Sequence, residues 1–420
     1  MINKLKPKSE FSKNVLTLMT GTTIAQAIPI AISPILTRIY TPEDFGVFAL
    51  YMSVATLISA TATARYELAI MLPKKDEDAI NIMALSIIIA FIVSTITLLL
   101  VWFFNAQIVQ FLGNPEISNW LYFVPLTVLL TGIYQTFNYW SNRNKQYKRI
   151  AVNKVIQTFT MSTVNLGIGF SNFVVNGLIL GTISGQGLST LLLAKTVWDE
   201  DSKLLKKIKK IKILAMIKKH KKLPLLNLPN AIIDGFRLSG INLLIAKFFT
   251  MATLGQFSLA LKMVQVPMAL VGSSLSQVFF QKVSSASKND LYIIIKSFII
   301  KASLVAGPLF ILLFLFAEEV FIFIFGDKWV LAGQSASIMT PWLFLNFISS
   351  PLSSLFIVLN KQEIMLIFSV FYMIVPLFII FIFYSQPFIH LLWILTCSMS
   401  IMLLFIICLV MYYTYKEGVK

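Results

Sequence analysis

The sequence is poor in charge, in cysteine and in histidine. Charged residues make up 13% of the 420 residues, whereas a soluble domain has about 25%, so an ordinary soluble fold is excluded. Cys397 and Cys408 are the only cysteines, and both lie in the last apolar run, where we expect them to be buried as small hydrophobic side chains. With two histidines and no nucleophile arrangement, the sequence predicts no disulfide framework, no metal site and no cofactor.

Apolar segments are abundant instead, because 57% of the residues are hydrophobic. Runs of about 20 such residues recur along the chain, and each can cross a hydrocarbon core of about 30 Å. We predict an all-α integral membrane protein with about twelve spanning helices, since helices satisfy their own backbone groups in lipid. The expected spans are 14–38, 44–72, 79–104, 118–141, 150–170, 173–197, 224–249, 253–280, 296–325, 334–359, 362–384 and 388–414.

The net charge of +17 is unevenly distributed between the expected loops. Lysine and arginine gather in the N-terminal segment, starting with Lys4, Lys6 and Lys8, and in the second, fourth and following even-numbered loops, while the opposite loops hold only Arg38, Lys247 and Lys328. Because basic loops stay in the cytoplasm, both termini are predicted to be cytoplasmic.

The two halves of the chain repeat each other. TRIYTPEDFGVFALYM, from Thr37, aligns with AKFFTMATLGQFSLAL, from Ala246, and places Thr41 over Thr250 and Gly46 over Gly255. Each half holds an even number of spans, so the repeat is parallel, with its axis along the membrane normal. This predicts two six-helix bundles, 1–198 and 224–420.

Residues 199–223 would join these bundles as a basic amphipathic cytoplasmic linker. In a helix, Leu204, Ile208, Ile211 and Ala215 share one face, and lysines fill much of the rest. This pattern is typical of a helix on an anionic lipid leaflet. Nucleic-acid binding is the less favoured alternative, because membrane spans tie the segment down at both ends.

The acidic turn at Glu43 and Asp44 has two possible roles. Carboxylates at the outer end of a span could be catalytic, as in some membrane glycosyltransferases. However, Thr41 suits a helix N-cap, Pro42 suits the first helical position, and Asp44 lies three residues after the cap. Capping explains the whole turn and is the favoured interpretation.

Three cations lie well inside expected spans, namely Arg65, Arg237 and Lys262. A charge there costs at least about 2.5 kcal/mol, so it usually faces a cavity or a partner. Together the three would form a site for a phosphate or diphosphate. Alternatively, Glu67 and Asp234 neutralise two of them as structural ion pairs, and Arg65 extends to the cytoplasmic interface. Either carboxylate could also carry a coupling proton.

Three segments together carry a family resemblance. They are TRIYTPEDFGVFALY, ARYELAIMLP (64–73) and GQFSLALKMVQVPMALVGSSLSQVFFQK (255–282). With the twelve-span layout they resemble Wzx-type polysaccharide flippases of the multidrug/oligosaccharidyl-lipid/polysaccharide (MOP) exporter superfamily. The resemblance implies a MATE-like V-shaped pair of bundles with a cationic cavity, to which Arg65, Arg237 and Lys262 would contribute.

The implied activity is alternating-access transfer of an undecaprenyl-diphosphate-linked O-antigen, capsule or exopolysaccharide unit from the cytoplasmic to the periplasmic leaflet of a bacterial inner membrane. Polysaccharide polymerase and chain-length regulator proteins would be its partners. The rivals are a Wzy-like polymerase or membrane glycosyltransferase, which needs a larger outer loop, and a multidrug exporter, which needs an acidic cavity.

Overall fold

A computed structural model describes residues 10–171, 176–284, 286, 288–353, 355–359 and 361–418 of the chain. Every regular element in these residues is helical, which confirms the predicted all-α class. Lys4, Lys6 and Lys8 lie outside the described residues, so their cytoplasmic location stays a prediction.

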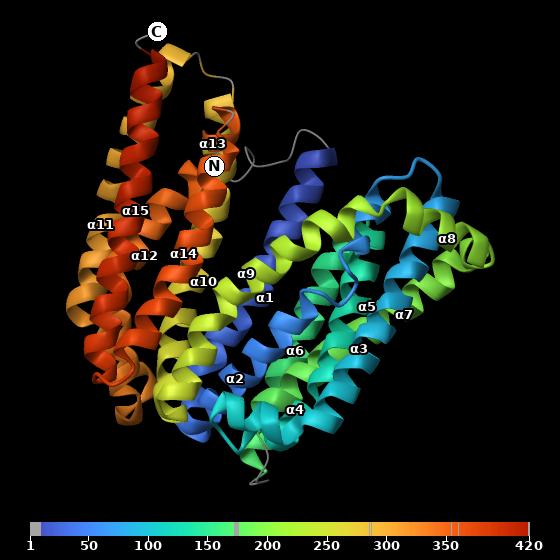
Figure 1. Cartoon of the computed structure of the whole chain (residues 1–420), viewed down its shortest axis with the longest axis horizontal. Coiled ribbons are helices and arrows are strands. Elements are labelled where there is room, and N and C mark those ends of the chain that lie inside the picture. Colours follow the sequence, from blue (N-terminus) through green and yellow to red (C-terminus); the bar gives the residue numbers. More distant parts are fainter. Residues whose placement is uncertain are drawn as a thin grey trace, which may run out of the picture. The chain divides into compact units, whose positions relative to one another are not determined.

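The helices follow one another along the chain as labelled in Figure 1. They are α1 (Glu10–Ile39), α2 (Pro42–Ser59), the 3₁₀ helix η2 (Tyr66–Met71), α3 (Asp76–Leu112), α4 (Ile117–Leu121), α5 (Val124–Arg143), α6 (Tyr147–Phe170), α7 (Gly177–Leu205), α8 (Lys210–Lys219), α9 (Lys222–Phe248), α10 (Met251–Ser284), α11 (Lys288–Phe325), the 3₁₀ helix η3 (Asp327–Trp329), α12 (Val330–Leu352), α13 (Leu355–Val358), α14 (Gln362–Phe383) and α15 (Phe388–Gly418).

The chain forms two compact units. Unit 1 comprises Met1–Tyr40 and Val47–Ser239, and unit 2 comprises Thr41–Gly46 and Gly240–Lys420. Helix α2 therefore begins in unit 2 and continues in unit 1, while α9 begins in unit 1 and ends in unit 2. The basic segment 199–223 belongs to unit 1, so this division differs from the predicted bundles by that segment, by Thr41–Gly46 and by the part of α9 up to Ser239.

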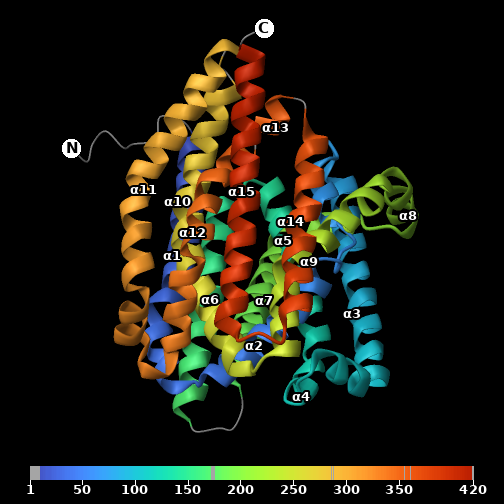
Figure 2. The same ribbon diagram turned by 60° about the vertical axis from the view of Figure 1, so that its left-hand side comes forward.

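Each unit is a bundle of long helices (Figures 1 and 2). In unit 1, α6 packs against both α1 and α7, while α5 contacts α3 and α7. In unit 2, α12 packs against α10, α11 and α15, and α14 packs against α15. The predicted span 44–72 is wrong in its second half, because α2 ends at Ser59. The other predicted spans all correspond to helices.

Seven described helical segments are long and apolar enough to cross a membrane. They lie in α1, α3, α4–α5, α7, α11, α14 and α15. The remaining expected spans, α2, α6, α9, α10 and α12, are present as helices. The two cysteines are exposed on α15 rather than buried, because they lie on a face of α15 turned away from the other helices of its unit.

The repeated glycines mark a close crossing inside unit 2. A β-carbon on Gly46 would lie 2.0 Å from the carbonyl oxygen of Met251, and one on Gly255 would lie 1.9 Å from that of Pro42. Only glycine permits such an approach of two backbones. The contact is reciprocal, since Pro42 aligns with Met251 as Gly46 does with Gly255. The repeat in the sequence is thus a local two-fold contact.

The first turn of α2 has a second attachment to unit 2. The ring of Phe45 packs edge-on against Trp329, with 4.9 Å between the ring centroids, and Trp329 is completely buried. Aromatic pairs prefer this geometry. The start of α2 is therefore fixed by side-chain packing as well as by the glycine crossing.

Candidate functional site

The candidate site begins where the second predicted span breaks. Between Ala60 and Arg65 the chain leaves the α-helix, and it resumes as η2. Ala64 and Arg65 have positive φ angles of 48° and 66°. The left-handed conformation costs a residue with a β-carbon about 1–2 kcal/mol. Two such residues in succession persist only where the surroundings impose the conformation, which is common at functional sites.

The break buries a glutamate and gives it two partners. The side chain of Glu67 is only 1% exposed. Thr63 donates a hydrogen bond from Oγ1 to Glu67 Oε2, and Nη1 of Arg65 lies 3.5 Å from Oε1. Tyr139 of α5 is near enough for both charges to act on it. A buried carboxylate needs such compensation, and removing its cation would leave an uncompensated charge.

Arg65 keeps unused hydrogen-bonding capacity. Its side chain is 32% exposed, and its Nε is buried without a hydrogen-bond partner among the residues that the structure describes. A guanidinium has five N–H donors in a planar fork that matches a phosphate or carboxylate. Arg65 can therefore hold Glu67 with one nitrogen and present other donors to a second anion.

Arg143, at the end of α5, holds η2 in place. Its Nη1 donates to the carbonyl oxygen of Ile70 over 3.0 Å, and its Nη2 lies 2.8 Å from Asp76 Oδ1. In the sequence Arg143 is one of many basic loop residues. Its supporting role depends on a contact across more than seventy positions, so no local signal identifies it.

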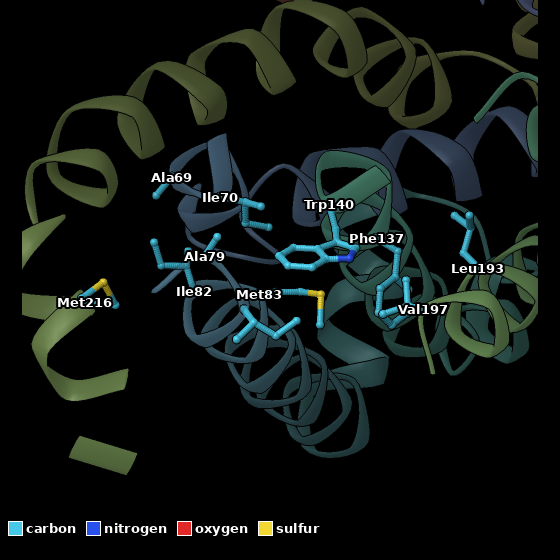
Figure 3. Packing of buried hydrophobic residues seen from close by; sticks show 11 residues of the cluster. Ala69, Ile70, Ala79, Ile82, Met83, Phe137, Trp140, Leu193, Val197 and Met216 are labelled. Carbon is cyan, nitrogen blue, oxygen red and sulfur yellow. The ribbon is translucent and has the colours of Figure 1, made fainter. Parts of the chain in front are cut away.

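A hydrophobic cluster backs the same element (Figure 3). Ala69 and Ile70 of η2 are completely buried, together with Trp140 of α5 and Ile82 of α3. Met216 of α8 completes the cluster. Because η2 is packed from several helices and bonded by Arg143, the strained turn before it is held rigidly.

Arg237 and Asp234 form the ion pair that their spacing on α9 allows. Arg237 Nη2 lies 3.1 Å from Asp234 Oδ1, and the side chains are 43% and 61% exposed. Both belong to unit 1, as do Arg65 and Glu67. Lys262 lies on α10 in unit 2, is exposed, and has no carboxylate within ion-pair distance among the described residues.

The acidic turn is a helix cap. The backbone N–H of Thr41 donates to Asp44 Oδ2 over 2.8 Å, and the N–H of Asp44 donates back to Thr41 Oγ1 over 3.2 Å. This reciprocal arrangement is a capping box. At the repeated position, Thr253 donates its N–H to Thr250 Oγ1 over 3.2 Å, so the second cap lacks the carboxylate.

The basic segment differs from the single helix that was predicted. The chain turns between α7 and α8, where Asn81 of α3 accepts a hydrogen bond from the N–H of Lys209 over 2.9 Å. As a result, Ile211 is 82% exposed and does not share a buried face with Ile208. Burial, and secondarily Lys219, lower the pKa of His220 at the end of α8, so lysines carry the charge of this helix.

Polar side chains between α5, α6 and α7 were not predicted as site residues from the sequence. Gln157 donates a hydrogen bond to Gln186, and Tyr134 lies near Asn153, whose Nδ2 is buried without a partner among the described residues. The sequence signal that could have identified them is the presence of amide side chains within otherwise apolar helices. Such groups mark interior or cavity-lining positions of membrane bundles.

Searches for known relatives give a family and a fold. The family described as "Polysaccharide biosynthesis protein" matches residues 35–333, which include η2, Arg237 and Lys262. No curated protein matches the chain. Within the part of the chain that the structure describes, no group of His, Cys, Asp and Glu could hold a metal ion.

Solved structures share the fold at low sequence identity. A lipid II flippase, MurJ, in an inward closed conformation matches with a TM-score of 0.74 and 12% identity over 96% of this chain and 89% of that one. The MATE multidrug transporter DinF-BH gives a TM-score of 0.65 and 14% identity, over 96% and 95% of the two chains. An inward-facing MATE family transporter of the MOP superfamily gives 0.63 and 14%, over 95% of each chain.

Proposed function

The chain belongs to the family of polysaccharide biosynthesis proteins, and on this premise we propose that it is a flippase for a polyprenyl-diphosphate-linked oligosaccharide. The substrate would be an undecaprenyl-linked unit of O-antigen, capsule or exopolysaccharide, moved from the cytoplasmic to the periplasmic leaflet by alternating access. The match over residues 35–333 carries the proposal, and the fold shared with a lipid II flippase supports it.

The diphosphate would bind to Arg65 first. This guanidinium is partly exposed and has donors that Glu67 does not use. Arg237 and Lys262 are the further proposed contacts, since both are exposed cations within apolar helices. Charge-assisted bonds from arginine to phosphate are short and directional. The lipid chain would remain in the bilayer.

Glu67 is the leading candidate for coupling to a proton. When ionised it holds Arg65, and when protonated it would release the guanidinium to the diphosphate. The buried Thr63 hydroxyl can hydrogen-bond either form. Asp234 is a second candidate, because it is likewise paired with an arginine, Arg237, which its protonation would release.

We further propose that the protein resides in the bacterial inner membrane with both termini in the cytoplasm, as the lysine distribution favours. A polysaccharide polymerase and a chain-length regulator are the proposed protein partners. An enzyme of the polymerase or glycosyltransferase type is less well supported, because Asp44 of the outer acidic turn is engaged in the helix cap.

The test is translocation of the lipid-linked unit at equal protein levels. We expect Arg65→Ala to abolish most transport and Arg65→Lys to retain part of it, because lysine keeps the charge without the fork. Arg237→Ala and Lys262→Ala should lower it. Lys74→Ala, at an exposed loop position, is the control. Unchanged transport in all three alanine variants would refute the anion site.

Glu67→Gln tests the coupling step separately. The variant keeps the shape and hydrogen bonds of the side chain but cannot lose a proton. We expect it to bind substrate while its transport no longer responds to an imposed proton gradient. A response equal to that of the unmodified protein would eliminate Glu67 as the proton carrier.

The shared fold with multidrug transporters suggests drug export as a second function. A cationic drug would need a free carboxylate. Glu67 and Asp234, however, are each ion-paired with an arginine. We therefore expect no change in resistance to cationic drugs when the protein is overproduced.

A further inference from the structure

Unit 1 contains a second feature that the proposed function does not use. A cavity of about 640 Å³ lies between α3 and α7, on the side of the bundle where α8 packs. Its inner wall includes Met83, Phe137 and Val197, which belong to the cluster in Figure 3. Ile208 and Ile213, from the turn before α8 and from α8 itself, close one end. The volume is in the range of ligand sites, about 300–1,000 Å³.

The cavity opens on the apolar outer surface of the unit. Ile88 and Trp198, at its edge, are 46% and 70% exposed. Phe91 and Ile92, the next turn of α3, are exposed as well. In a protein that spans a membrane, such a surface faces hydrocarbon. An acyl chain can therefore enter from the bilayer without crossing water.

Polar lining residues occur only at the end near the basic segment. Ser202 and Lys206 are the two, and both are exposed. The neighbouring Lys207 and Lys212 are bound to Glu77 at 2.6 and 2.9 Å. Lys206, by contrast, has no ion-pair partner among the described residues. The site thus combines an apolar slot with a single available cation at its rim.

A ligand of this cavity must match both the apolar slot and the lysine at its rim. The lysine-rich end of the unit faces the cytoplasmic leaflet by the positive-inside rule, and this leaflet is rich in anionic lipid. Exposed tryptophan at the level of the headgroups, as Trp198 would be, is typical of a membrane interface. We propose that the cavity binds one anionic glycerophospholipid, with an acyl chain between α3 and α7 and its phosphate on Lys206.

This lipid would have a definite structural consequence. Helix α8 is attached to α3 through Asn81, Glu77 and the buried Met216. A chain in the cavity would also contact Ile208 and Ile213, which line it. The lipid therefore fastens the basic helix to the bundle, and it does so whether or not the protein transports an oligosaccharide.

Native mass spectrometry of the purified protein tests this inference directly. The protein is titrated with phosphatidylglycerol and, separately, with phosphatidylcholine of the same chain length. We expect one phosphatidylglycerol to bind about fivefold more tightly, the effect of roughly one lysine near a phosphate. Lys206→Gln should abolish that preference, while Lys203→Gln, an exposed lysine outside the lining, should keep it.

Two further measurements keep the proposal open to refutation. Ala194→Phe fills the slot from α7 and should remove the tight site for both lipids. If this variant does not fold, the lipid preference of Lys206→Gln, compared with that of the unmodified protein, still tests the proposal. Equal lipid preference in Lys206→Gln and the unmodified protein would overturn the proposal. Displacement of phosphatidylglycerol by an equimolar polyprenyl phosphate would also overturn it, by identifying the cavity as a substrate site.

Discussion

Replacing Gly255 with alanine tests the crossing that explains the internal repeat. The new β-carbon would lie 1.9 Å from the carbonyl oxygen of Pro42, whereas ordinary contact begins at 3.4 Å. The two backbones would have to separate by roughly 1.5 Å, and neither can rotate away as a side chain would. Overpacking of this kind costs about 1–3 kcal/mol, and backbone contact places the variant at the upper end.

The helix propensity of alanine works in the opposite direction. Alanine is favoured over glycine inside a helix by about 1 kcal/mol, so the net loss should be about 1–2 kcal/mol. Gly272→Ala measures the helix-propensity gain alone, because Gly272 lies on the same helix and its added β-carbon would meet nothing within 4 Å. We expect Gly272→Ala to be neutral or slightly stabilising.

The assay is the thermal unfolding midpoint of the detergent-purified protein. Gly255→Ala should unfold several degrees below Gly272→Ala. Gly46→Ala should behave like Gly255→Ala, because its β-carbon meets Met251 in the same way. The unfolding midpoint of the double variant should fall by less than the sum of the two single decreases, since one separation of the backbones relieves both clashes. Equal midpoints for Gly255→Ala and Gly272→Ala would refute the close crossing.

Three further predictions concern the support of η2, the cap of α2 and the attachment of α8. Arg143→Gln removes the charged hydrogen bond to η2 and should cost about 1.5–3 kcal/mol of unfolding free energy, seen as a lower thermal midpoint. Asp44→Ala removes the capping carboxylate and should cost about 1 kcal/mol by the same measurement, with transport retained. Asn81→Ala should expose the turn before α8 to protease, because the N–H of Lys209 loses its acceptor.

Matched variants separate these effects from a general loss of charge. Arg149→Gln removes a similar ion pair, to Glu200 at 3.2 Å, that does not touch η2. It should therefore destabilise less than Arg143→Gln. If Asp44→Ala lost transport but kept the unfolding midpoint of the unmodified protein, the turn would have a catalytic or binding role. Unchanged cleavage in Asn81→Ala would show that other contacts hold α8.

Local sequence was sufficient for the helix cap at Thr41 and for most of the spans. A capping box depends on residues three positions apart, and a span depends on the composition of about 20 neighbours, so both are written in short segments. The alignment of Gly46 with Gly255 likewise predicted a repeat. It did not reveal that these two glycines touch, because contact depends on how helices pack.

The break before η2 could not be read from the sequence. Nothing local prevents Ala64 and Arg65 from being helical, and both residues favour a helix over the left-handed conformation that they adopt. The long apolar pattern therefore predicted a continuous span. Contacts from distant helices, such as Arg143 on Ile70, impose the turn and bury Glu67.

The sequence by itself thus determined an all-α membrane protein of repeated halves, with its intramembrane cations and its family resemblance. Hydropathy, charge distribution and capping need no knowledge of distant neighbours. Only the tertiary structure decided that Arg65 and Glu67 share a strained, packed turn and that Lys206 stands at the rim of an apolar cavity. Those features arise where segments far apart in the chain meet, and there packing outweighs local preference.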